Sequence, residues 1–228
     1  DETYYKILVP EKNSKGKGVR KGYLWVVVGI NTRMIYLLYD DGSRSEKVIL
    51  NELGGCKGII QSDGYSPYRK LESDAYPHIT RIPCLQHIKR KFIDCGEDEP
   101  DAKRIVELIN TLYQNEHKHK IGVDGWTVEQ NLVHRKKYAP DILGEIKDVL
   151  DDIEERGDLL PKSELKEAVT YLRNEWNAVV DIFNYGDTYL DNNIVERMNR
   201  YISLSRKNSL FFGSHKGAER GAILYTIA

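Results

Sequence analysis

The first third of the chain contains apolar runs that predict β-strands. Residues 3–9, 23–30 and 34–39 are rich in β-branched and aromatic side chains. The second and third runs are almost continuously apolar, which is typical of strands buried on both faces of a sheet. The three residues 31–33 between them fit a hairpin turn.

Helical and strand-like segments then alternate up to residue 95. The expected elements, in order, are a helix over 43–53, a strand over 58–63, a short helix over 65–71, a strand over 79–83 and a helix over 84–95. Three adjacent strands followed by alternating helix and strand predict an α/β fold: a five-stranded mixed sheet flanked by helices.

Residues 99–183 have a different pattern, because strand signals disappear and apolar residues recur at helical spacing. We therefore expect an all-helical insertion there. It divides the core domain into a first part over 1–98 and a C-terminal part over 184–228. We expect Trp126 and Trp176 to be core residues of the insertion, with base stacking as the open alternative.

Composition restricts the possible partners. The 228 residues carry a net charge of −1, so any polyanion site must be a local patch. Three cysteines are too few for a disulfide framework, which indicates a reducing compartment. No apolar run approaches the roughly 20 residues of a membrane span, so no membrane partner is expected. Both ends of the chain suggest cuts within a longer protein.

One segment, residues 190–220, departs from this balance. Glu196, one of its three acids, lies among six cations: Arg197, Arg200, Arg206, Lys207, Lys216 and Arg220. A second basic run, Lys89, Arg90 and Lys91, lies on an expected helix and forms either a solvated face or a phosphate patch. Three asparagines can bond sugar or phosphate, or cap helices: Asn192, Asn193 and Asn208.

Three acids stand where a catalytic site of an α/β protein would gather them. Asp1 is at the head of the first strand, Asp63 ends the fourth strand, and Glu196 lies in the first turn of a helix. If they converge, their oxygens can hold hard cations, Mg²⁺ or Mn²⁺. Two such metals about 3.5–4 Å apart support phosphodiester cleavage by a two-metal site.

Each acid also has a structural alternative. Asp1 can be a frayed residue, with Glu2 as an equally suitable acid beside it. Asp63 precedes glycine and can simply open a turn. Asn193 and Glu196 have the spacing of a capping box, with Asn193 as the cap.

Cys84 and His87 form half of a zinc-binding pattern. A structural zinc needs four ligands, and no second pair at similar spacing is present. We therefore expect a buried cysteine at a strand–helix junction and a histidine that points toward the sheet edge.

Six segments in order along the chain resemble the catalytic region of insertion-sequence-66-type transposases, a bacterial family with a ribonuclease-H-like fold and a DDE active site. The segments are residues 1–3 (DET), 21–28 (KGYLWVVV), 59–68 (IIQSDGYSPY), 84–92 (CLQHIKRKF), 160–176 (LPKSELKEAVTYLRNEW) and 190–220. Each segment alone is weak evidence for the family, whereas six segments in the same order are specific to it. This chain departs from the usual pattern in two places. Leu85 stands where the family usually has an aromatic residue, and Met198 and Asn199 follow the Glu-Arg pair, where the family usually has small or apolar residues.

The resemblance implies that Asp1, Asp63 and Glu196 are catalytic and bind two Mg²⁺ or Mn²⁺ ions. It implies metal-dependent nicking of DNA at transposon ends, followed by attack of the freed 3′ hydroxyl on target DNA. It also implies a homo-oligomer in the active complex and a nucleoid-associated location in the bacterial cytoplasm.

Other residues are assigned supporting roles. The expected DNA-binding residues are Lys89, Arg90, Lys91, Arg197, Arg200, Arg206, Lys207, Asn208 and Lys216. The expected accessory residues are Cys84, His87, Asn192 and Asn193. A non-catalytic DNA-binding or assembly module, and another ribonuclease-H-like nuclease, remain the alternatives.

Overall fold

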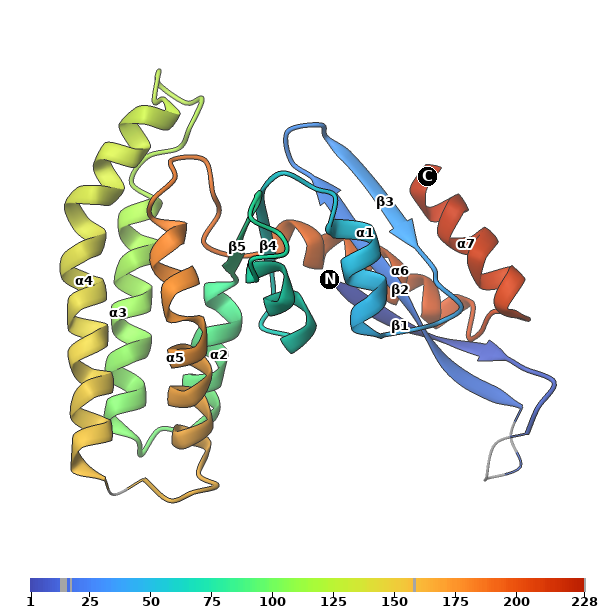
Figure 1. The fold of residues 1–228 in the computed structure, drawn as a ribbon, viewed down its shortest axis with the longest axis horizontal. Coiled ribbons are helices and arrows are strands. Elements are labelled where there is room, and N and C mark those ends of the chain that lie inside the picture. The colour runs from blue at the N-terminus through green and yellow to red at the C-terminus, as the bar shows by residue number, and fades with distance from the viewer. Residues whose placement is uncertain (13–15, 17, 158, 228) are drawn as a thin grey trace. The chain divides into compact units, whose positions relative to one another are not determined.

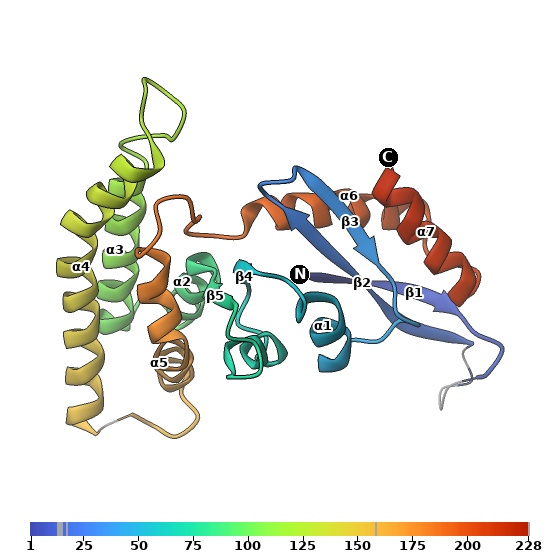
Figure 2. The same ribbon diagram turned by 45° about the horizontal axis from the view of Figure 1, so that its top comes forward.

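A computed structural model describes residues 1–12, 16, 18–157 and 159–227 (Figures 1 and 2). The chain forms two compact units, and each is described by itself. The first unit consists of Asp1–Cys56 and Asn192–Ala228, and the second of Lys57–Asp191. The predicted division of the chain at residues 98 and 183 stays a prediction.

The first unit is built on a three-stranded antiparallel sheet with the order β1-β2-β3. Its strands are β1 (Glu2–Leu8), β2 (Val19–Gly29) and β3 (Met34–Leu38), and its helices are α1 (Glu46–Leu53), α6 (Asn193–Asn208) and α7 (His215–Ile227). The predicted strands and the predicted first helix are therefore confirmed.

Alternation along the strands decides which helix each side chain meets. Tyr5, Leu24 and Val26 lie on one face and form a core with Ile202 of α6 and Ala222 of α7. On the opposite face, Trp25 donates from its indole nitrogen to the Ser43 carbonyl, 3.0 Å away, just before α1. Helices α6 and α7 thus pack on one face of this sheet, and the segment that leads into α1 contacts the other.

The third strand corrects one expectation. Residues 34–39 were expected to be buried on both faces, but Met34 is 63% exposed and Ile35 is 38% exposed. The reason is topological, because β3 is an edge strand that pairs with β2 alone among the described strands.

The second unit combines a two-stranded parallel sheet with a packed group of helices. Its elements are β4 (Gly58–Ser62), the 3₁₀ helix η1 (Ser66–Glu72), β5 (Ile79–Pro83), α2 (Leu85–Asp94), α3 (Pro100–Glu116), α4 (Val128–Arg156) and α5 (Glu164–Ile182). Residue Gly58 pairs with Ile79, and Ser62 with Pro83. One hydrophobic core joins β5 to all four α-helices. The predicted helical character of residues 99–183 is confirmed.

Two further expectations concern the sheet and the cysteines. The described strands form two sheets, of three antiparallel and two parallel strands, rather than a single sheet of five. Cys56, Cys84 and Cys95 are all free thiols. None of the helices in the described part of the chain combines the length and the hydrophobicity that a transmembrane span requires.

Candidate active site

Asp1 extends the first strand and faces α6. Its nitrogen donates to the Val26 carbonyl (3.2 Å), and the Val26 nitrogen donates to the Asp1 carbonyl (2.7 Å). Since side chains alternate along a strand, Asp1 points to the same face as Tyr5, which is buried in the core shared with α6. The residue is therefore paired with β2 rather than frayed.

Both oxygens of the Asp1 carboxylate accept a hydrogen bond. The backbone nitrogen of Glu2 donates to Oδ1 at 2.8 Å. The side-chain amide of Asn199, on α6, donates from Nδ2 to Oδ2 at 2.8 Å. A bond to each oxygen restricts the orientation of the carboxylate plane.

Glu2, the alternative acid, is already engaged on the other face. Its side chain is 4% exposed and forms an ion pair with Arg44 at 2.6 Å. The alternation that directs Asp1 toward α6 directs Glu2 toward the segment that leads into α1. The geometry thus favours Asp1 over Glu2 as the acid of this strand.

Glu196 lies on α6 and is not part of a capping box. The helix begins at Asn193, its N-cap is Asn192, and the Asn192 side chain makes no capping hydrogen bond. The prediction that Asn193 is the cap is therefore wrong. Glu196 lies one residue beyond the position that reaches back in a capping box, so the strongest structural alternative for this acid is removed.

The predicted DNA-binding residues of α6 and α7 differ in their local engagement. Arg206 donates to the Tyr4 carbonyl and lies 4.5 Å from the centroid of the Tyr4 ring. Its guanidinium therefore also holds β1. The other predicted DNA-binding residues of this region are exposed: Arg197, Arg200, Lys207, Asn208 and Lys216.

In the second unit, Asp63 follows β4 and does open a turn. Its Oδ1 accepts a hydrogen bond from the Tyr65 nitrogen at 3.0 Å, the geometry of an Asx turn. This bond does not exclude metal binding, because an ionised carboxylate has about four acceptor sites. The turn and the catalytic role are compatible for this residue.

The glycine after Asp63 is required by a close approach of α5. A Cβ added to Gly64 would lie 1.9 Å from the Tyr171 hydroxyl and 2.3 Å from its Cζ. Burial, and after it the charges of Glu175 and Asp63, raise the pKa of Tyr171, so this phenol stays neutral. Tyr171 thus packs directly onto the turn that carries the second acid.

A buried ion pair also contacts the turn at Asp63. The Arg81 side chain is fully buried and is paired with Glu175 of α5, which is 1% exposed, and with the half-exposed Glu72. Arg81 Nη1 also donates to Ser62 Oγ at 3.3 Å and to the Asp63 carbonyl at 3.4 Å. Burial opposes the charge on Arg81, but Glu175 outweighs it and raises the pKa of this arginine.

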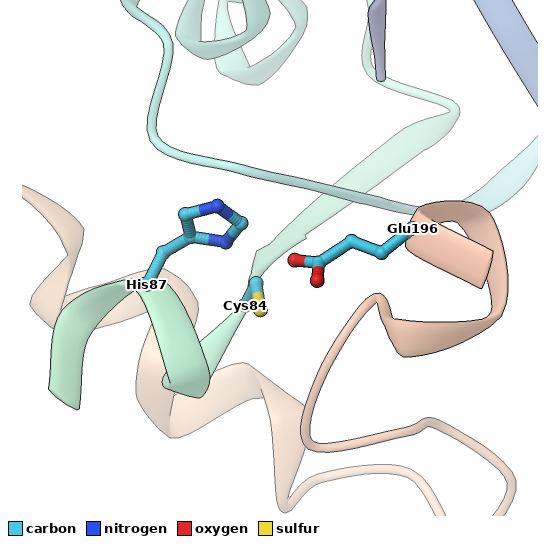
Figure 3. Close-up of side chains that lie close together, drawn as sticks. All are labelled: Cys84, His87 and Glu196. Atoms are coloured by element: carbon cyan, nitrogen blue, oxygen red, sulfur yellow. The ribbon is translucent and has the colours of Figure 1, made fainter. Parts of the chain in front are cut away.

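Cys84 and His87 lie at the junction of β5 and α2 (Figure 3; Glu196, also drawn, belongs to α6 of the first unit). Cys84 is 1% exposed, as expected for a buried junction residue. Its sulfur lies within 4.8 Å of a ring nitrogen of His87. On the same helix, Arg90 and Lys91 are exposed and Lys89 is partly buried.

Four residues that support the acids were missed in the sequence: Asn199, Arg81, Tyr171 and Glu175. Only Glu175 gave a visible signal, since it stands three residues after Leu172 on the apolar stripe of α5 and is buried there. Nothing in the sequence indicated the contact of Asn199 with Asp1. The structure brings Asp1 beside the helix that carries Glu196, whereas Asp63 belongs to the other unit.

Comparisons with known proteins give one family. The sequence model described as "Transposase IS66 family" matches residues 1–220. Three curated proteins of Sinorhizobium fredii (strain NBRC 101917 / NGR234), all described as uncharacterized, are also similar. They are y4jD (30% identical over 192 residues, 81% of this chain and 36% of the relative), y4hP (26% over 208, 84% and 36%) and y4qI (28% over 242, 100% and 43%). The chain therefore spans less than half the length of these relatives.

Proposed function

The chain belongs to the IS66 family of transposases, and we propose that it is a DDE catalytic domain that nicks DNA at transposon ends and joins the freed 3′ hydroxyl to target DNA. Membership in the family carries the general function in transposition. The catalytic assignment is our own, and so is the activity of the whole protein, because the matched relatives are much longer.

One observation carries the catalytic proposal: the carboxylate of Asp1 is bound to α6, one turn from Glu196. Two acids from distant parts of the sequence are thus held on one strand and its adjacent helix. The competing explanations are weakened, since Asp1 is paired with β2, Glu2 is engaged by Arg44, and Glu196 does not form a capping box.

The donor set fits a hard divalent cation. Asp1, Asp63 and Glu196 offer carboxylate oxygens, which suit Mg²⁺ and Mn²⁺. A pair of such ions would supply an activated nucleophile and stabilise the leaving oxygen. In this proposal the three carboxylates would hold the ions, and the bonds from Glu2 and Asn199 would keep the Asp1 carboxylate oriented.

The proposal requires Asp63 to join the other two acids in the active protein. The predicted ribonuclease-H-like sheet of five strands would bring them together. The turn around Asp63 is already shaped by Tyr65, Tyr171 and Arg81 within its own unit. No change inside that turn is therefore needed for Asp63 to act as a ligand.

DNA would be bound through its phosphates. The exposed cations of α6 and α7 are suited to phosphate contacts, which position a duplex without reading its sequence. We extend this role to Lys89, Arg90 and Lys91 of α2, and we expect a homo-oligomer in the active complex, which light scattering of the DNA-bound protein measures. We expect the protein to act on this DNA in the bacterial cytoplasm.

The test is a nicking assay on supercoiled DNA that carries the transposon ends, with Mg²⁺. Asp63→Asn and Glu196→Gln should abolish nicking while thermal melting stays close to that of the parent, because each change keeps the side-chain shape. Glu167→Gln, at an exposed position of α5, is the matched control and should nick normally. If either active-site variant nicks as well as the parent, the catalytic assignment is wrong and a DNA-binding or assembly module becomes the better description.

A further inference from the structure

The contact between Asn199 and Asp1 joins the first strand to the helix that carries Glu196. The two residues are 198 positions apart in the sequence, and the Nδ2–Oδ2 distance is 2.8 Å. The amide orientation is fixed by chemistry, since an ionised carboxylate can only accept hydrogen bonds and Nδ2 is the donor of asparagine.

The contact holds the one Asp1 oxygen that the strand itself does not hold. Oδ1 accepts from the Glu2 nitrogen and the Asp1 backbone is paired with Val26, whereas Oδ2 accepts from Asn199 of α6. Asn199 lies three residues after Glu196, and residues at this spacing are neighbours on a helix surface. A bond to Oδ2 therefore sets the Asp1 carboxylate relative to the same helix surface.

Packing alone does not explain an asparagine here. Among the described residues, nothing donates a hydrogen bond to Asn199 Oδ1, although that atom is buried. A buried acceptor without a donor destabilises the fold, whereas an apolar side chain of similar size would avoid this penalty.

We propose that Asn199 is a positioning residue that orients the Asp1 carboxylate for a divalent cation. The inference rests on the proposed function of Asp1 as a metal ligand. Asn199 itself does not touch the cation. It acts through Asp1, as hydrogen-bonding partners of ligating carboxylates do elsewhere, where their loss commonly weakens metal binding by about 10- to 100-fold.

The test compares Asn199→Leu and Asn199→Ala with the parent full chain, using Mn²⁺ alone as the probe. Affinity is measured by electron paramagnetic resonance of free Mn²⁺ and by the Mn²⁺-dependent rise in melting temperature. Because the bond contributes orientation and not a ligand, we expect roughly tenfold weaker Mn²⁺ binding. The leucine variant without metal should melt at or above the parent temperature, and saturating Mn²⁺ should restore most of the nicking.

Asn177→Leu, the same change at an exposed position of α5, is the matched control and should bind Mn²⁺ like the parent. Parent-like Mn²⁺ affinity in whichever Asn199 variant folds would overturn the inference. The two proposals fail separately. If Glu196→Gln abolishes nicking and Mn²⁺ binding while the Asn199 variants bind normally, only the role of Asn199 is wrong. If Glu196→Gln nicks normally, the catalytic proposal itself fails.

Discussion

Glu175→Gln tests the buried ion pair beneath the Asp63 turn. The change removes one charge and keeps the shape of a side chain that is 1% exposed and faces the fully buried guanidinium of Arg81. Arg81 then keeps Glu72 as its charged partner, and that residue is half exposed. The substitution should therefore destabilise the second unit strongly.

The expected loss of unfolding free energy depends on the partners that Arg81 keeps in the variant. Removing one partner of a buried ion pair costs about 3–5 kcal/mol. Since Glu72 stays in place and glutamine can still accept a hydrogen bond from Arg81, we expect about 2–3 kcal/mol. For a unit of this size, that loss lowers the melting temperature by roughly 6–15 °C.

The assay is urea and thermal unfolding of the full chain, followed by circular dichroism at a wavelength dominated by helices. Glu167→Gln is the matched control, because it makes the same change at an exposed position of the same helix, and it should stay within about 0.5 kcal/mol of the parent. If Glu175→Gln also unfolds within that margin, Arg81 does not depend on Glu175 and the reasoning is refuted.

Three further perturbations test other parts of the fold. Gly64→Ala should cost about 1–3 kcal/mol of unfolding free energy, because the new methyl group meets the ring of Tyr171. In a Tyr171→Leu background the same change should cost less. If Gly64→Ala costs the same in both backgrounds of this double-mutant cycle, the close approach is contradicted. Arg135→Leu should cost about 3–5 kcal/mol in urea unfolding, since it leaves Glu116 and several carbonyls without their buried donor; a loss below about 1 kcal/mol would contradict this. Burial raises the pKa of Tyr39 from 10.0 to about 12, so the stability that its neutral phenol contributes is complete below pH 10 and is lost as the pH rises through about 12. A Tyr39→Phe variant should not show this loss of stability at high pH. Parallel profiles of stability against pH for parent and variant would contradict the prediction.

Periodic patterns predicted the secondary structure of this chain well. Strands and helices are local, so apolar runs near residues 23–39 and helical spacing over 99–183 were sufficient to find them. The burial of β3 was predicted wrongly because an apolar run does not distinguish a central strand from an edge strand. The capping box at Asn193 was predicted wrongly because two consecutive asparagines both qualify as caps, and tertiary structure started the helix at the second.

Contacts between polar groups far apart in sequence left almost no signal. The Arg81–Glu175 pair spans 94 positions, and the contact of Asn199 with Asp1 spans 198. Neither follows a period of two or 3.6 residues, so neither could be found from spacing. Asp1, Asp63 and Glu196 could be proposed together because they stand at strand ends and a helix start and because the resemblance implies them, and their catalytic role stays a prediction. The groups that orient them required the fold.

The contacts of α5 change the role assigned to the helical segment 99–183. From the sequence alone, α5 belonged to an insertion that was expected to be distinct from the catalytic core. In the structure, the same helix supplies Tyr171, which packs on Gly64. It also supplies Glu175, the buried ion-pair partner of Arg81, and Arg81 donates a hydrogen bond to the Asp63 carbonyl. A perturbation of α5 can therefore reach the second acid within its own unit, without any change in the acid itself. The helical segment is thus a structural support of the Asp63 turn, and variation along its buried face should affect the position of that carboxylate as well as stability.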